Sequence, residues 1–267
     1  MMPKFGSITN PSKNVLREIE EIGKMGFDFA EIGIEGPEGM PKVLMRKKDD
    51  IKKTLKKYGL FAIAHTAWWI ELGTPHEKVR KAWVNESKEM IDTASELGVE
   101  KINFHFESNG MFIQTKKVRR LILKSFVASL QELVEYAEQR GLTVMLENGA
   151  LKTEMSTLEN YKYVLDNVEG LRAHLDFGHL IVAGGMENLK LFVRTFKRKL
   201  EHIHISDNYG VTDAHLPITV GLLDEKEIVK ILKRIGYNKT ITFEVFTKTR
   251  DLAKFSMEKF KELWKSE

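Results

Sequence analysis

The chain has 267 residues, of which 42% are hydrophobic and 30% charged, a composition typical of a soluble globular protein rather than a disordered one. Its formal net charge of +4 does not by itself indicate nucleic-acid binding, and no apolar run is long enough to span a membrane. The absence of cysteine excludes disulfides, thiol nucleophiles and iron–sulfur clusters, so any metal ion must be bound by His, Asp or Glu. The amino-terminal residues lack the apolar stretch of a signal peptide, and we expect a cytoplasmic protein.

A β-rich run followed by a helix-forming segment recurs along the chain. The predicted strands are Lys4–Ile8, Phe29–Ile34, Phe61–Thr66, Ile102–Phe106, Thr143–Asn148, Arg172–Phe177, His202–Asp207 and Thr240–Phe246. The predicted helices are Asn14–Met25, Lys47–Tyr58, a long one ending near Leu97, Lys116–Arg140, Thr157–Asn167, Met186–Phe196, Glu225–Ile235 and a last one ending near Trp264. Strict alternation of strands and helices implies parallel strands and predicts one α/β domain over residues 1–267, a single (β/α)8 TIM barrel. An open, doubly wound sheet is the alternative, but no glycine-rich phosphate turn follows the first strand.

Side-chain alternation puts polar residues on one face of these strands. In the sixth strand, for example, Ala173 and Leu175 oppose His174 and Asp176. If the apolar face packs on the helices, six ionisable residues meet inside the barrel at the carboxyl ends of the strands, where active sites of this fold are built: His65, His105, Glu147, Asp176, His204 and Glu244. A single inward histidine is more often a hydrogen-bonded core residue, but such a group is hard to bury without a cation among its members. We expect His174 and His202, one layer deeper, to be structural or to support the ligands.

Further donors lie just outside the strands. His179 follows Asp176 by three residues in the turn leaving the sixth strand, and Asp213 and His215 lie two residues apart in the loop after the seventh. That pair could reach one ion, or could belong to a polar surface loop. Asp207 follows His204 by three residues and could orient an imidazole. Imidazole and carboxylate donors without sulfur suit Mn²⁺, Co²⁺, Zn²⁺ or Mg²⁺, and the sequence does not choose among them.

Assembled in order, these segments resemble the xylose isomerase-like barrel superfamily, which includes endonuclease IV and the sugar-phosphate isomerases and epimerases. The resemblance spans essentially the whole chain and is carried by AHTAWW around His65, INFHFES around His105, MLENG around Glu147, LDFGH at Asp176 and His179, HIHISDN around His204, DAH at Asp213–His215, and TFEVF around Glu244. Each motif alone is weak, but seven in the right order are specific for the superfamily.

The resemblance implies two different metal sites. The endonuclease IV branch binds three ions through nine residues. Each of these nine positions has a matching residue in this chain: His65, His105, Glu147, Asp176, His179, His204, Asp213, His215 and Glu244. In the isomerase and epimerase branch, Glu147, Asp176, His204 and Glu244 would hold one divalent ion. There the two glutamates would also be the catalytic groups that move protons, and His65, Trp68 and His179 would contact the sugar.

Two enzymatic functions follow, and departures from the nuclease pattern favour the first. The first is metal-dependent isomerisation or epimerisation of a sugar or sugar phosphate by proton transfer through an enediolate. The second is a zinc-dependent phosphodiesterase acting at abasic sites in DNA. The segments DFGH and HIHISDN resemble the corresponding motifs of the sugar enzymes. No arginine-rich loop, which could follow a DNA backbone, comes after the first strand. Trp68 and Trp69 could wall a sugar pocket, unstack bases or simply pack.

The remaining expectations concern partners. A barrel that binds a sugar or a metal without chemistry is a third reading, which retention of both candidate proton-transfer glutamates disfavours. We expect the protein to bind a small-molecule sugar and no membrane, and to bind DNA only under the second function. The sequence does not fix the number of subunits, and a homo-oligomer is compatible with it. Lys152 and Lys248 lie in loops where a substrate phosphate could bind.

Overall fold

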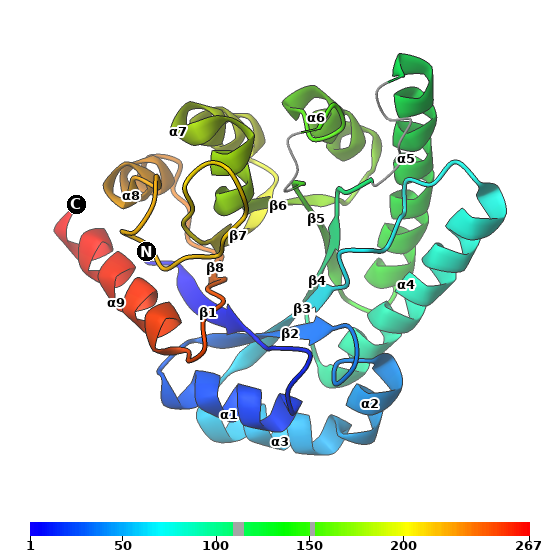
Figure 1. Cartoon of the computed structure of the whole chain (residues 1–267). Coiled ribbons are helices and arrows are strands. Elements are labelled where there is room, and N and C mark those ends of the chain that lie inside the picture. The colour runs from blue at the N-terminus through cyan, green and yellow to red at the C-terminus, as the bar shows by residue number, and fades with distance from the viewer. Residues whose placement is uncertain (109–114, 150–152) are drawn as a thin grey trace.

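The computed structural model is a closed barrel of eight parallel strands surrounded by helices (Figure 1). It describes residues 1–108, 115–149 and 153–267, so Lys152 lies outside the described residues. The strands are β1 (Lys4–Ile8), β2 (Phe29–Ile34), β3 (Phe61–Thr66), β4 (Lys101–His105), β5 (Thr143–Glu147), β6 (Arg172–Asp176), β7 (Leu200–Ile205) and β8 (Thr240–Phe243). They pair in chain order, and β8 returns to β1 with Ile241 opposite Phe5. The predicted TIM barrel is therefore confirmed, and the open sheet is excluded.

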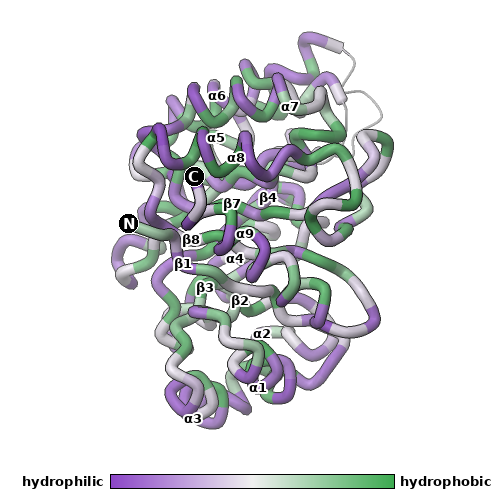
Figure 2. The backbone as a smooth tube through the Cα atoms, turned by 90° about the vertical axis from the view of Figure 1, so that its left-hand side faces the viewer, coloured by the Kyte–Doolittle hydropathy of each residue, from purple (hydrophilic) through white to green (hydrophobic). Residues whose placement is uncertain are grey.

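The helices cover the outside of the barrel. They are α1 (Val15–Lys24), α2 (Pro41–Arg46), α3 (Lys48–Tyr58), α4 (Glu77–Leu97), α5 (Lys116–Glu138), α6 (Leu158–Asn167), α7 (Phe177–Phe196), α8 (Glu225–Arg234) and α9 (Asp251–Ser266). Their ends follow from local chemistry: the Asn14 side chain accepts the backbone N–H groups of Leu16 and Arg17 to start α1, and Gly59 ends α3 in a left-handed conformation. Hydrophobic and hydrophilic segments alternate along the outer helices, as expected when one face packs on the strands (Figure 2). No helix of the described residues is long and apolar enough to cross a membrane.

The connection after β6 differs from the sequence prediction. We placed a helix at Met186–Phe196 and a turn before it, but α7 begins immediately after Asp176. The Asp176 carboxylate caps the helix, because its Oδ1 accepts the backbone N–H of His179 at 2.7 Å. Gly184 and Gly185 have non-helical backbone angles and interrupt α7, which is why periodicity alone showed only its second part.

The barrel interior is layered along its axis. Near the amino-terminal ends of the strands, the Phe29 ring lies against Gly6, where even a β-carbon would meet it at 2.2 Å. Above this apolar floor, Glu31, His174 and His202 are fully buried. The other strand face, exemplified by Ile32, packs under the helices. The cavity that reaches the ionisable side chains is lined by residues at the carboxyl ends of the strands, such as His65 and Glu147.

Candidate active site

The nine side chains selected from the sequence meet at the carboxyl ends of the strands. His65, His105, Glu147, Asp176 and His204 stand at the ends of β3, β4, β5, β6 and β7. His179 lies in the first turn of α7, Asp213 and His215 come from the connection between β7 and α8, and Glu244 follows β8 directly. Their ligand atoms form three groups. The first contains His65, His105 and Glu147, the second surrounds His204, and the third contains His179, Asp213 and His215. Asp213 and His215 belong to this cluster rather than to an outward-facing surface loop.

The first group joins β3, β4 and β5. His65 Nε2 and His105 Nε2 are 3.2 Å apart, and they lie 3.7 and 3.2 Å from Glu147 Oε2. Donors at 2.0–2.2 Å from a tetrahedral Zn²⁺ are separated by about 3.3 Å. All three side chains are buried, and the Asn103 amide fixes the carboxylate by donating to Glu147 Oε2 at 2.6 Å. These three donor atoms therefore have the spacing of a metal site.

The second group surrounds His204 Nδ1. Glu244 Oε2 lies 3.0 Å from this nitrogen, Asp176 Oδ2 3.6 Å and Glu147 Oε1 3.9 Å. Asp176 Oδ2 is buried and accepts no hydrogen bond from any described residue. Burial, together with the nearby charges of Asp213, Glu244 and Glu147, raises the pKa of Asp176 to about 7. Three carboxylates and one imidazole around a common point form a donor set that fits a divalent cation, which would relieve this repulsion.

The third group joins α7 to the β7–α8 connection. Asp213 Oδ2 lies 3.1 Å from His179 Nε2 and 2.9 Å from His215 Nε2. The other nitrogen of His179, Nδ1, lies 2.9 Å from the backbone oxygen of Asn148, to which it can donate. With its proton on Nδ1, a neutral imidazole turns a lone pair toward the Asp213 carboxylate, so this contact needs either a second proton or a cation between the two groups. The group thus offers two imidazoles and one carboxylate, which are donor types that a divalent metal binds.

Glu31 lies directly beneath the candidate ligands and was not predicted from the sequence. Its carboxylate lies 3.0 Å from His204 Nε2 and accepts a hydrogen bond from the Thr242 hydroxyl at 2.5 Å, with His202 Nε2 at 3.4 Å. Burial opposes ionisation, but the charges of His204 and His202 outweigh it and hold the pKa of Glu31 well below its usual range. Glu31 thus anchors Nε2 of His204 and leaves Nδ1 facing the second ligand group. The signal was the alternation of β2, in which Phe29, Glu31 and Gly33 share the inner face.

The structure places Asp207 and His202 in supporting positions outside the ligand groups. Asp207 does not orient an imidazole: its carboxylate accepts the backbone N–H groups of four residues in its own loop, Asn208, Val220, Gly221 and Leu223. His202, in the deeper layer, contacts Thr240 Oγ1 at 2.8 Å and supports Glu31 rather than facing the cavity. The tight turn around Asp207 therefore organises the loop that carries Asp213 and His215.

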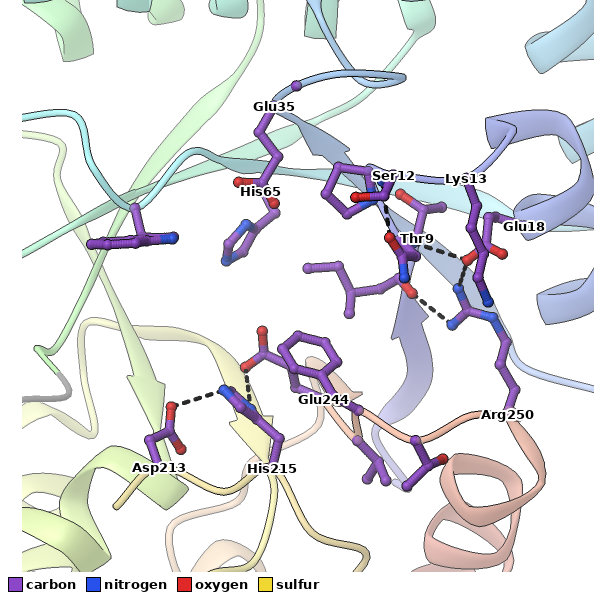
Figure 3. A pocket seen from close by; sticks show the side chains of 18 of the residues that line it. Thr9, Ser12, Lys13, Glu18, Glu35, His65, Asp213, His215, Glu244 and Arg250 are labelled. Atoms are coloured by element: carbon purple, nitrogen blue, oxygen red, sulfur yellow. Dashed lines mark hydrogen bonds and ion pairs between the residues drawn. The ribbon is translucent and has the colours of Figure 1, made fainter.

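The ligand groups form the floor of a cavity of about 820 Å³. Trp68 and Trp69 line it with side chains that are 55% and 44% exposed, so they are not core packing residues. The loops after β1, β2 and β8 supply most of the rest of the wall (Figure 3). Within this wall Arg250 is occupied, because it pairs with Glu18 and donates to the backbone oxygen of Ile8. The volume is in the range of small-molecule sites.

Comparison with known proteins identifies the family. A family model described as xylose isomerase-like TIM barrel matches residues 19–263. The chain belongs to the xylose isomerase-like TIM barrel family. Among curated members, an uncharacterized protein of Methanocaldococcus jannaschii, MJ1311, is 29% identical over 90% of this chain and 83% of its own. A probable endonuclease 4 of Aquifex aeolicus is 23% identical over 87% of each chain.

Solved structures of the family superpose over nearly the whole barrel. A D-tagatose 3-epimerase-like protein has a TM-score of 0.84 and 26% identity, covering 98% of this chain and 97% of its own. The IolI protein, solved with a bound zinc atom, has a TM-score of 0.79 and 22% identity, covering 98% of both chains. The second likeness concerns the fold alone, since the identity is low.

Proposed function

We propose that the protein is a divalent-metal-dependent isomerase or epimerase of ketoses. The observation that carries this proposal is the placement of Glu147 and Glu244, two buried carboxylates from β5 and β8 whose oxygens lie within 3.9 and 3.0 Å of one nitrogen of His204. The similarity to the D-tagatose 3-epimerase-like protein supports the choice of a ketose. The IolI protein, which shares the fold, was solved with a bound zinc atom, and this supports a metal-dependent activity.

Asp176, His204 and Glu244 form a group that could hold the catalytic ion, and Glu147, whose Oε1 lies 3.9 Å from His204 Nδ1, would be its fourth ligand. Bound there, a divalent ion polarises the ketose carbonyl and so acidifies the adjacent C–H. The chain's own residues then perform the proton transfer. One glutamate removes the proton and the other returns it, to the same or the opposite face of the enediolate. His65, His179 and Trp68, which line the cavity, position the sugar.

The ionisation of the two glutamates suits this role. Burial opposes their charge, but neighbouring imidazoles outweigh it: His174 and His105 hold the pKa of Glu147 well below its usual range, and His204 and His215 lower that of Glu244. Both carboxylates are therefore ionised at neutral pH and able to accept a proton. Asn103 donates to Glu147 Oε2 at 2.6 Å and holds this carboxylate in place.

The proposal is tested with D-tagatose and D-fructose in D₂O. We expect a second ketose (epimerisation) or an aldose (isomerisation) to form and solvent deuterium to be incorporated into the product, which distinguishes proton transfer from a hydride shift. Chelator treatment should abolish both signals, and added Mn²⁺, Co²⁺, Zn²⁺ or Mg²⁺ should restore them. A protein that turns over no ketose with any of these ions would overturn the proposal.

A second candidate, cleavage of DNA at abasic sites, is favoured by one specific observation. All nine ligand positions of the nuclease pattern are present with their donor atoms grouped in three sets, and the probable endonuclease 4 of Aquifex aeolicus is a relative. This activity predicts cleavage of a duplex with one abasic site and retention on immobilised DNA that falls steeply with salt. Three metal ions per chain by elemental analysis would also favour it, whereas one ion with ketose turnover favours the epimerase.

A further inference from the structure

We propose that Glu35 is a substrate-binding residue that accepts hydrogen bonds from hydroxyl groups of the sugar and thereby selects an unphosphorylated ketose. This proposal rests on the function proposed above and adds a residue and a substrate class to it. Glu35 lies outside the nine ligand positions, in the connection between β2 and α2.

The position of Glu35 relative to the cavity is the first observation. It lines the cavity together with His65 and Trp68, and its side chain points from its loop toward His65 and the open space beyond (Figure 3). The residue is half-buried, yet its carboxylate makes no hydrogen bond or ion pair with any described residue. The other glutamates near it are occupied: Glu18 pairs with Arg250, and Glu38 with Lys47 at 2.7 Å.

The loop that carries Glu35 is held firmly. Gly39 packs so closely on it that an added β-carbon would meet the backbone oxygens of Gly33 and Glu35 at 2.0 and 2.6 Å. Thr9 Oγ1 accepts the backbone N–H of Gly33 at 3.0 Å, and the backbone N–H of Glu38 donates to the Pro11 oxygen at 2.8 Å. The backbone on both sides of Glu35 is therefore fixed against the loop after β1. A side chain on such a loop is positioned before the substrate arrives.

The chemistry of the site selects the ligand. Partial burial without a partner is unfavourable for a carboxylate. Burial raises the pKa of Glu35, the charge of His65 offsets this in part, and the charge of Glu244 adds to it. Sugar hydroxyls supply the missing donors as charge-assisted hydrogen bonds. A phosphate at the same place would add a second negative charge. Of the cations that line the cavity, Arg250 is engaged by Glu18, and Lys13 and Lys248 are exposed to solvent, which screens their charge.

The test compares two glutamates of one loop. Steady-state kinetics and calorimetric binding are measured with D-tagatose, D-fructose and D-fructose 6-phosphate for the wild type, Glu35→Ala, Glu35→Gln and the control Glu38→Gln. Loss of a hydrogen bond to a charged acceptor predicts a KM for the free ketoses that is at least about tenfold higher in Glu35→Ala, with kcat changed much less. Glu35→Gln should raise KM less. It should also lower the ratio of kcat/KM for D-fructose to kcat/KM for D-fructose 6-phosphate, because the glutamine carries no negative charge. Glu38→Gln should match the wild type.

The outcomes separate this proposal from the function on which it rests. Turnover of a free ketose with an unchanged KM in Glu35→Ala would overturn the role of Glu35 and leave the epimerase intact. A wild type that prefers D-fructose 6-phosphate would overturn the substrate class. Absence of both binding and turnover of every ketose by the metal-loaded wild type would overturn the proposed function, and the Glu35 proposal with it.

Discussion

The two halves of the cavity are built in different ways. In the ligand half, formed by β3 to β8, the donor side chains stand mostly on strand ends, and His105, the most exposed of those on strands, is only 8% exposed. In the open half, formed by the loops after β1, β2 and β8 together with Trp68 and Trp69, the side chains stand on loops and several are largely exposed. The first half concentrates carboxylates and imidazoles that could hold a cation, and the second offers aromatic faces and scattered polar groups. Chemistry should therefore depend on the first half and substrate choice on the second.

The largest effects should come from the two glutamates of the ligand half. Replacing Glu147 or Glu244 by glutamine keeps the shape but removes the proton acceptor, so we expect kcat to fall by about 10²- to 10⁴-fold. Circular dichroism should show a folded barrel, and Glu38→Gln serves as the control. Near-normal turnover in both variants would remove the proton-transfer roles assigned to them.

The next effect should come from below the ligand half, at Glu31. Glu31→Gln loses the charge that anchors His204 Nε2, and loss of such a supporting carboxylate weakens metal binding by about 10- to 100-fold. Competition with a chromophoric chelator measures this affinity directly. Glu18→Gln is the control, since Glu18 is also a buried carboxylate but pairs with Arg250, away from the ligands. If Glu31→Gln lowered the melting temperature without changing metal affinity, its role would be structural only.

The same division explains what could be predicted from the sequence. Strand alternation has a period of two residues, so the inward direction of Asp176 and His204 followed once the strands were recognised. Glu31 obeys the same rule, so the alternation of β2 is sufficient to predict that it points inward. The direction of the Glu35 side chain could not be predicted, because no period governs where the side chains of a loop point. Nor could the start of α7, which depends on the cap formed by Asp176.

A third prediction concerns the pH dependence of stability, which should be determined by the ligand half alone. Burial lowers the pKa values of His65 and His215, but the carboxylates of Glu147 and Glu244, respectively, outweigh it and raise these values from 6.5 to about 8 and about 9. Both histidines therefore stabilise the metal-free fold below pH 6.5, and this contribution is lost as the pH rises through 8 and 9. The raised pKa of Asp176 acts in the same direction between about pH 4 and 7.

We accordingly expect the melting temperature of chelator-treated protein to fall between pH 6.5 and 9. A bound ion requires deprotonated ligands, so the increase in melting temperature on adding Zn²⁺ or Mn²⁺ should grow over the same range. Thermal scans with and without metal check both slopes. An increase that is largest at low pH would contradict the assignment of imidazoles as ligands.

The smallest effect should come from the open half, at Trp68. Its indole is 55% exposed and brings no ionisable group, so Trp68→Ala should leave metal content and kcat nearly unchanged. Packing against the apolar face of a sugar is worth about as much as an aromatic contact, roughly 0.5–1.5 kcal/mol, which corresponds to a two- to tenfold rise in KM. If the partner were DNA, stacking on unpaired bases would instead contribute about 1–3 kcal/mol per base, and the loss would appear in binding of an abasic duplex. Measuring ketose KM and duplex affinity on this one variant therefore shows which partner the exposed aromatic residue contacts, because only one of the two values should change.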